Sequence, residues 1–100
     1  MSLTALRGLR AALASDNALL ATFVLIPRVE IVEIVAGAGF QVVIIDCEHG
    51  PFGRNELVPL IAAARAAGVY SLIRLPDNSP REIGGALDAG ADGVLSLIHI

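Results

Sequence analysis

The sequence has 100 residues, of which 55% are hydrophobic and 17% charged, a composition typical of a globular domain rather than a disordered chain. Its formal net charge of −3, the lack of a basic run and an aromatic content of only 4% argue against a nucleic-acid partner. No apolar stretch approaches the roughly 18 residues of a membrane span, and the single cysteine permits no internal disulfide, so we expect a cytoplasmic protein without membrane contact.

Helical and strand-like segments alternate along the chain. Segments with apolar residues at helical spacing predict helices, and short β-branched runs predict strands. In chain order we expect a helix at 4–14, a strand at 22–26, a helix at 29–36, a strand at 41–46, a helix at 55–67, a strand at 70–75, a helix from 80 to about 88 and a strand from about 93. Asn55 is the expected cap of the third helix, with Pro59 near its first turn. Ser79, Pro80 and Glu82 predict a capping box before the fourth helix.

This alternation predicts an α/β fold. Consecutive strands that are joined by helices run parallel to one another. Four such strands form either a small open sheet or one half of a barrel, and the pattern by itself leaves both open. No linker, repeat or low-complexity segment divides the chain, so we expect a single domain.

Ionisable side chains follow the second and third predicted strands. Asp46, Glu48 and His49 come at the end of the second strand, and Arg74 lies near the end of the third. The carboxyl ends of neighbouring parallel strands meet at one edge of the sheet, where catalytic groups of α/β folds collect. An arginine there can clamp a carboxylate or stabilise an oxyanion, and a histidine can move protons near neutral pH. The combination suits proton transfer next to a carbonyl group of an anionic substrate.

A purely structural interpretation of the same residues stays open. Arg74 could tie two strand ends together through a salt bridge to Asp46 or Glu48, and His49 could be a turn residue bonded to the backbone. Cys47 is expected to be a small packing residue, because no neighbouring positive charge activates its thiol. All seven basic residues are arginines, so this chain cannot form the lysine Schiff base used in one kind of carbonyl catalysis. Carbonyl or enolate chemistry here would rest on arginine, histidine or a metal ion.

Four motifs follow one another along the chain between about residues 20 and 94. They are Ala36-Gly37-Ala38-Gly39-Phe40, Asp46-x-Glu48-His49-Gly50-Pro51, Ile73-Arg74-Leu75-Pro76 and Leu87-Asp88-Ala89-Gly90-Ala91. In this order they resemble the HpcH/HpaI aldolase/citrate lyase family, and most closely its members of the 4-hydroxy-2-oxoheptanedioate aldolase and 2-keto-3-deoxy-L-rhamnonate aldolase type. The ordered set is more specific than any one of the motifs.

The resemblance implies the N-terminal half of a (β/α)8 TIM barrel. It also implies a carbon–carbon lyase, a class II pyruvate aldolase that cleaves a 4-hydroxy-2-oxo acid to pyruvate and an aldehyde. In such an enzyme His49 would be the catalytic base, Arg74 would bind the substrate and stabilise the enolate, and Asp88 would raise the basicity of the histidine. Asp46 and Glu48 would contact these catalytic residues rather than the substrate and would help to position them.

The resemblance further implies a divalent metal ion (Mg, Mn or Co) as cofactor. The family binds this ion through a glutamate and an aspartate beyond the fourth strand, so we expect no metal ligand in this chain. The partners implied are a small-molecule 2-oxo acid and an aldehyde, and the full-length form is expected to be a homo-oligomer.

Asp88 fits these expectations least well. The predicted fourth helix ends near Asp88, and in a plain barrel that end of a helix faces away from the strand tips. Either the helix is shorter than predicted, or Asp88 reaches a site shaped by another subunit. The structural alternative is a helix-end aspartate in solvent.

The last residues of the chain depart from the family's pattern. The run Leu95-Ser96-Leu97-Ile98-His99-Ile100 matches the translation of a transposase-type sequencing adaptor, CTG TCT CTT ATA CAC ATC. We therefore expect a partial barrel domain at 1–94 and a non-native tail at 95–100, and we do not take His99 as a metal ligand. Four strands leave two unpaired sheet edges, so we expect the isolated chain to be inactive and weakly stable.

Two other functions stay open. One is a citrate-lyase-type or malyl-CoA-type lyase of the same superfamily, which would bind a CoA thioester. The other is a small non-enzymatic module that binds a carboxylate through Arg74 without a metal and unfolds in one sharp transition.

Overall fold

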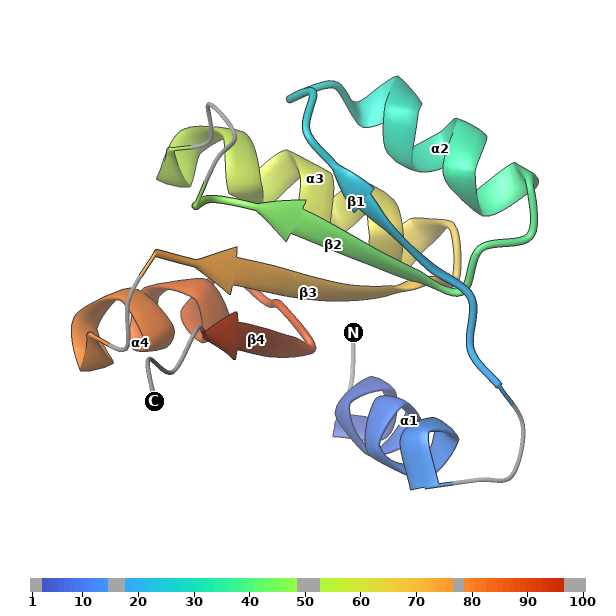
Figure 1. Cartoon of the computed structure of the whole chain (residues 1–100), viewed down its shortest axis with the longest axis horizontal. Coiled ribbons are helices and arrows are strands. Elements are labelled where there is room, and N and C mark those ends of the chain that lie inside the picture. Colours follow the sequence, from blue (N-terminus) through green and yellow to red (C-terminus); the bar gives the residue numbers. More distant parts are fainter. Residues whose placement is uncertain (1–2, 15–17, 49–52, 77–78, 97–100) are drawn as a thin grey trace.

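A computed structural model describes residues 3–14, 18–48, 53–76 and 79–96. Helices and strands alternate along the chain as α1 (Leu3–Ala14), β1 (Ala21–Val24), α2 (Val29–Gly37), β2 (Val42–Asp46), α3 (Arg54–Ala66), β3 (Tyr70–Leu75), α4 (Pro80–Asp88) and β4 (Gly93–Ser96). The strands form one parallel sheet in the order β1-β2-β3-β4 (Figure 1). The predicted α/β alternation and parallel sheet are confirmed. No helix within the described ranges has the length and apolar character needed to cross a membrane.

The hydrophobic core lies between one face of the sheet and the helices α2, α3 and α4. Val43, Ile45 and Ile73 point into this layer and are fully buried. They meet Leu60 and Ile61 of α3, which are also buried. Because side chains alternate along a strand, the residues between these positions must face the other side of the sheet.

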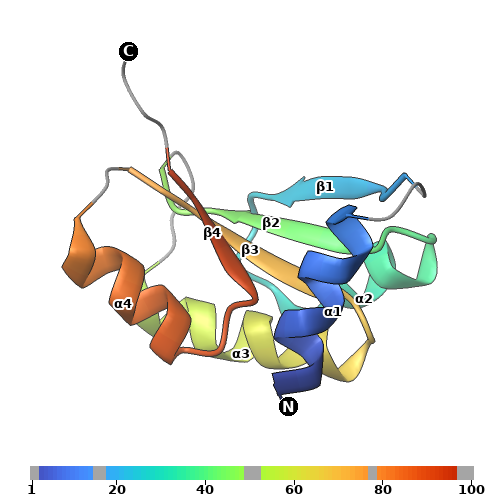
Figure 2. The same ribbon diagram turned by 90° about the horizontal axis from the view of Figure 1, so that it is seen from below.

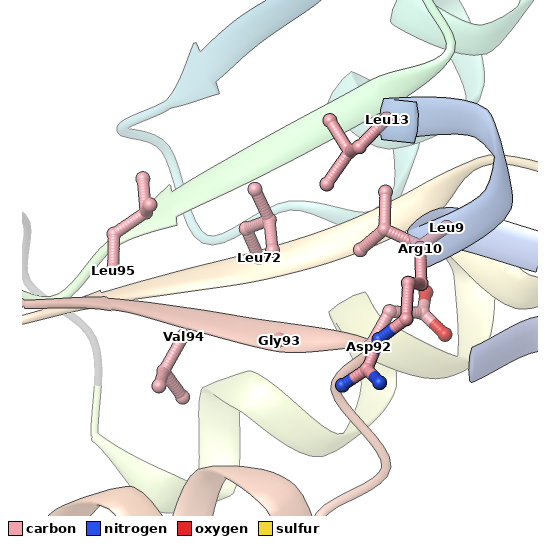
Figure 3. A pocket seen from close by; sticks show the side chains of 8 residues that line it. All are labelled: Leu9, Arg10, Leu13, Leu72, Asp92, Gly93, Val94 and Leu95. Carbon is pink, nitrogen blue, oxygen red and sulfur yellow. The ribbon is translucent and has the colours of Figure 1, made fainter. Parts of the chain in front are cut away.

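That other side, which we call the inner face, is only partly covered. Phe23 of β1, Ile44 of β2 and Leu72 of β3 share one row across it, because they are paired in register. Figures 1 and 2 show α1 apart from the layer of α2, α3 and α4, beside the amino ends of the strands. There Leu9 and Leu13 of α1 line a cavity of about 570 Å³ together with Leu72 and the start of β4 (Figure 3). This cavity extends along β4 from Asp92 to Leu95, the register partner of Arg74.

The first strand is shorter than the sequence predicts. It ends at Val24, whereas the β-branched and leucine run had suggested an end at Ile26. The chain turns after the strand through a hydrogen bond from the Arg28 N–H to the Ile26 carbonyl oxygen at 2.8 Å. Ile26 is therefore an exposed turn residue rather than part of the sheet.

The start of α3 also corrects a prediction. Gly53, not Asn55, is the N-cap residue, and its backbone N–H donates to the carboxylate of Glu56 at 2.6 Å. Since the helix begins at Arg54, Pro59 lies inside the helix and not in its first turn. Its missing N–H leaves the Asn55 carbonyl without the usual helical donor.

The fourth helix begins and ends close to the predicted residues. Ser79 is its N-cap and Pro80 its first residue, but the Ser79 hydroxyl makes no capping hydrogen bond to the helix, so the predicted capping box is not formed. Gly90 follows the helix with a φ of +105°, a conformation that side chains other than glycine rarely adopt. The Arg65 guanidinium donates to the Gly90 carbonyl at 2.8 Å and ties this turn to α3.

Candidate active site at the strand tips

The carboxyl ends of β2 and β3 bring three predicted residues together. Asp46 and Arg74 are register partners on neighbouring strands. The Arg74 guanidinium lies 3.6 Å from a carboxylate oxygen of Asp46 through Nη1, and 3.6 Å from a carboxylate oxygen of Glu48 through Nη2. The carboxylates are well shielded, with side chains 5% and 14% exposed, while the Arg74 side chain is 24% exposed. One cation is thus shared by two largely buried anions at the rim of the sheet.

Backbone hydrogen bonds hold this cluster in place. The Cys47 N–H donates to the Arg74 carbonyl oxygen at 2.9 Å and extends the β2–β3 pairing past Asp46. The Glu48 N–H then donates to the Asp46 carboxylate at 2.9 Å, a local turn that an aspartate favours. This turn directs Glu48 back toward Arg74. The arrangement follows from the local sequence, in which a buried strand stops at an acidic residue.

Phe23 is the fourth member of the cluster and was not among the residues predicted for the site. Its ring lies 5.5 Å from the Arg74 Cζ atom, within the range of a cation–π contact. Side chains alternate along β1, so Phe23 and Val24 face opposite sides of the sheet. Val24 is fully buried, while Phe23 is 48% exposed on the inner face.

The geometry of Arg74 agrees with both interpretations of this residue. It ties strand ends together, as the structural interpretation expects. The 3.6 Å separations are longer than the roughly 2.7–2.9 Å of a charge-assisted hydrogen bond. A guanidinium has five N–H donors in one plane. Arg74 can therefore bind a further anion at the rim while its existing partners hold it in position.

Cys47 is a packing residue, as predicted. Burial, and secondarily the negative charges of Asp46 and Glu82, raise the pKa of its thiol to about 11. The thiol therefore stays protonated at neutral pH and is a poor nucleophile. It lines a cavity of about 510 Å³ between the beginnings of α3 and α4, on the helical side of the sheet.

The remaining predicted residues are not brought to this cluster. His49 lies outside the described residues. Asp88 is the last residue of α4 and is exposed. α4 leads from the carboxyl end of β3 to the amino end of β4 (Figure 1). Its last residue, Asp88, therefore lies near the amino ends of the strands, whereas Arg74 lies near their carboxyl ends. Within this chain the helix is not shorter than predicted, so that explanation for Asp88 is wrong.

The described residues do not suit a metal ion. None of them form a group of three or more His, Cys, Asp or Glu side chains that could hold one. The two carboxylates at the strand tips already face a guanidinium, whose positive charge opposes a second cation beside it.

Known proteins share this architecture and part of this sequence. No family model matches the chain. A hydroxypyruvate/pyruvate aldolase of Roseovarius nubinhibens is 33% identical over 86 residues, which is 86% of this chain and 34% of that protein. Crystal structures of an HpcH/HpaI aldolase from Desulfitobacterium hafniense DCB-2 and of an HpcH/HpaI aldolase/citrate lyase family protein from Burkholderia cenocepacia J2315 superpose with TM-scores of 0.80 each. Their identities are 33% and 27%, over 86% and 89% of this chain and 34% and 36% of theirs.

The chain spans about a third of the length of these relatives. Its four parallel strands, alternating with helices, are those of a TIM-barrel-type aldolase fold. The motif order and the shared architecture lead to one assignment: the chain belongs to the HpcH/HpaI aldolase/citrate lyase family.

Proposed function

We propose that the protein containing this chain is a metal-dependent pyruvate aldolase that cleaves a 4-hydroxy-2-oxo acid to pyruvate and an aldehyde. The observation that carries the proposal is the position of Arg74, a partly exposed cation held at the strand tips of an aldolase-family barrel. A 2-oxo acid offers a carboxylate and an oxo group side by side, and a planar guanidinium can bind both oxygens.

The reaction needs one proton acceptor and one stabilised anion. His49, acting through a water molecule, takes the proton from the 4-hydroxyl group. The bond between C3 and C4 breaks, the aldehyde leaves, and the electron pair moves to the enolate of pyruvate. Arg74 stabilises the negative charge on that enolate, and protonation at C3 then gives pyruvate.

The other predicted residues have supporting roles in this proposal. Asp46 and Glu48 hold the Arg74 guanidinium at the strand tips. Asp88 raises the basicity of His49 in a site shaped by another subunit, since its own chain places it at the other edge of the sheet. The divalent ion is bound by residues other than those described. The full-length protein acts as a homo-oligomer, and its partners are the 2-oxo acid and the aldehyde.

The test is release of pyruvate from 4-hydroxy-2-oxo acids, measured with added Mg, Mn or Co on the longest reading frame that contains this chain. Arg74→Lys should lower kcat/KM by about a hundredfold to a thousandfold, because it removes preorganised donors to the enolate. His49→Ala should abolish turnover. Arg28→Lys is the matched control, because Arg28, in the loop between β1 and α2, forms an exposed ion pair with Glu30 and does not belong to the cluster of Asp46, Glu48 and Arg74. No pyruvate release, or equal activity of the Arg74 and Arg28 variants, would overturn the proposal.

The 100-residue chain is assayed in parallel and is expected to be inactive. Turnover by this chain alone would show that the described cluster and His49 suffice for the chemistry.

A further inference from the structure

Phe23 lies on the inner face of the sheet, beside the cluster of Asp46, Glu48 and Arg74. It is the third residue of β1, on the inner face, and its ring remains 48% exposed. Its register partner on β2 is Ile44, which places Phe23 one same-face row nearer the amino end of the sheet than Asp46 and Arg74. The described contact of this ring is with the Arg74 guanidinium, whose Cζ atom lies 5.5 Å from the ring centre.

The contact requires Arg74 to lie across the sheet. Arg74 belongs to β3 and Phe23 to β1, with β2 between them. Neighbouring strands are about 4.8 Å apart, so the two backbones are roughly 10 Å apart. The Arg74 Cζ atom nevertheless lies 5.5 Å from the centre of the Phe23 ring. The two side chains therefore meet over β2, where Arg74 also faces the buried carboxylate of Asp46.

The ring and the two carboxylates hold different parts of the guanidinium. Asp46 and Glu48 attract the Nη1 and Nη2 ends. The ring of Phe23 attracts the positive charge through its π electrons and uses none of the N–H donors. It thereby limits the movement of the guanidinium without competing with a carboxylate ligand for those donors.

We infer that Phe23 is a positioning residue for Arg74, holding its guanidinium over the inner face of the sheet so that its N–H donors meet the carboxylate of the substrate. The inference rests on the proposed function, in which Arg74 binds a 2-oxo acid. The ring acts through Arg74 and takes no part in the bond-breaking step.

The experiment uses the full 100-residue chain with ¹⁵N-labelled arginine. Nuclear magnetic resonance of the arginine Nε–Hε groups reports whether each guanidinium is held or averaged by solvent, and Arg74→Lys identifies the Arg74 resonance. Phe23→Leu keeps apolar bulk but removes the ring, whereas Phe23→Tyr and Phe23→Trp keep a ring. Val58→Ala is the matched control, because Val58 is 49% exposed and belongs to α3.

We expect a dispersed, slowly exchanging Arg74 resonance in the unmodified chain. Phe23→Leu should move it measurably toward the averaged position of exposed arginines, since only the two ion pairs then hold the guanidinium, while Phe23→Tyr, Phe23→Trp and Val58→Ala should leave it unchanged. Pyruvate titrated against the same resonance should bind about two- to fivefold more weakly to Phe23→Leu, the range given by a cation–π contact at a partly exposed site.

An averaged Arg74 resonance in the unmodified chain would overturn the inference. So would an unchanged resonance in Phe23→Leu, or an equal loss in the leucine, tyrosine and tryptophan variants. A failure of the proposed function is recognised separately, in the turnover assay of the longest reading frame: no pyruvate would be released there, while the dependence of the Arg74 resonance on an aromatic residue 23 would persist.

Discussion

Replacing Arg74 by methionine should destabilise the chain strongly. Arg74→Met keeps most of the side-chain volume but removes the charge that faces Asp46 and Glu48. Both carboxylates would remain inside the cluster, with side chains only 5% and 14% exposed. A shielded carboxylate without its counter-charge is costly, because desolvation is no longer offset by attraction.

The structure limits the size of this effect. Removing one partner of a fully buried pair costs about 3–5 kcal/mol, while an exposed pair contributes about 0–1 kcal/mol. The Arg74 side chain is 24% exposed and both separations are 3.6 Å, which places the cluster between these limits. We therefore expect Arg74→Met to lower the free energy of unfolding by about 2 kcal/mol. With a urea m-value of about 2 kcal/mol per molar, the midpoint should fall by about 1 M.

Urea unfolding followed by circular dichroism measures this change, and a double mutant tests its cause. Asp46→Asn keeps an oxygen that can accept the Glu48 N–H while removing one buried charge. The combination of Asp46→Asn with Arg74→Met should therefore cost clearly less than the sum of the two single changes. Arg28→Met removes the arginine of an exposed pair, with side chains 67% and 61% exposed, and should have no measurable effect. The reasoning fails if Arg74→Met is as mild as Arg28→Met, or if the two changes in the double mutant are simply additive.

Three further changes probe the sheet and its turns. The pKa of the Cys47 thiol is raised to about 11, so the folded state holds this proton more tightly than an unfolded thiol with a pKa near 8.5. The free energy of unfolding should therefore fall by about 1–2 kcal/mol between roughly pH 8.5 and 11, after allowance for the partial exposure of the thiol. Urea titrations across this pH range measure the fall, and Cys47→Ser should remove it. Gly90→Ala should lower the free energy of unfolding by about 1–2 kcal/mol, because φ is +105° there. Gly84→Ala, in open space within α4, should raise it by up to about 1 kcal/mol. Thermal melts in which both variants shift the melting temperature in the same direction would contradict this. Asp92→Ala removes the acceptor of the Ser71 N–H, a 2.9 Å hydrogen bond, and should cost about 1–3 kcal/mol, while Asp92→Asn should retain most of the stability.

The order of elements could be predicted because local signals and tertiary packing agree. The strand 70–75 was predicted at its observed limits, since its β-branched and leucine residues lie between a helix-ending glycine and a proline. Gly90 likewise marked the end of α4. The errors occurred where two local signals competed. Asn55 is a good capping residue, but Glu56 closes the helix start onto the Gly53 N–H instead, and a preference for Asn over Gly at this position cannot reveal that.

The cluster at the strand tips was partly predictable. Parallel strands that leave the sheet at one edge necessarily bring Asp46 and Arg74 together, so their meeting followed from the α/β pattern. Phe23 could not be found in that way, because the sequence does not show that the Arg74 side chain crosses β2. Such a contact depends on which way a long side chain leans, and that direction is decided by the charges around it rather than by periodicity.

The two interpretations of Arg74 describe different properties of one side chain. Tying the strand ends together needs only a positive charge near Asp46 and Glu48, and a lysine ammonium supplies it. Binding a carboxylate and an oxo group together needs a rigid plane of donors, which lysine lacks. Arg74→Lys should therefore retain most of the stability that Arg74→Met loses, while it loses the activity proposed for the full-length protein. If Arg74 only tied the strand ends together, each variant would lose activity in proportion to its loss of stability. Comparing Arg74→Lys with Arg74→Met therefore separates the structural role of this side chain from its chemical role.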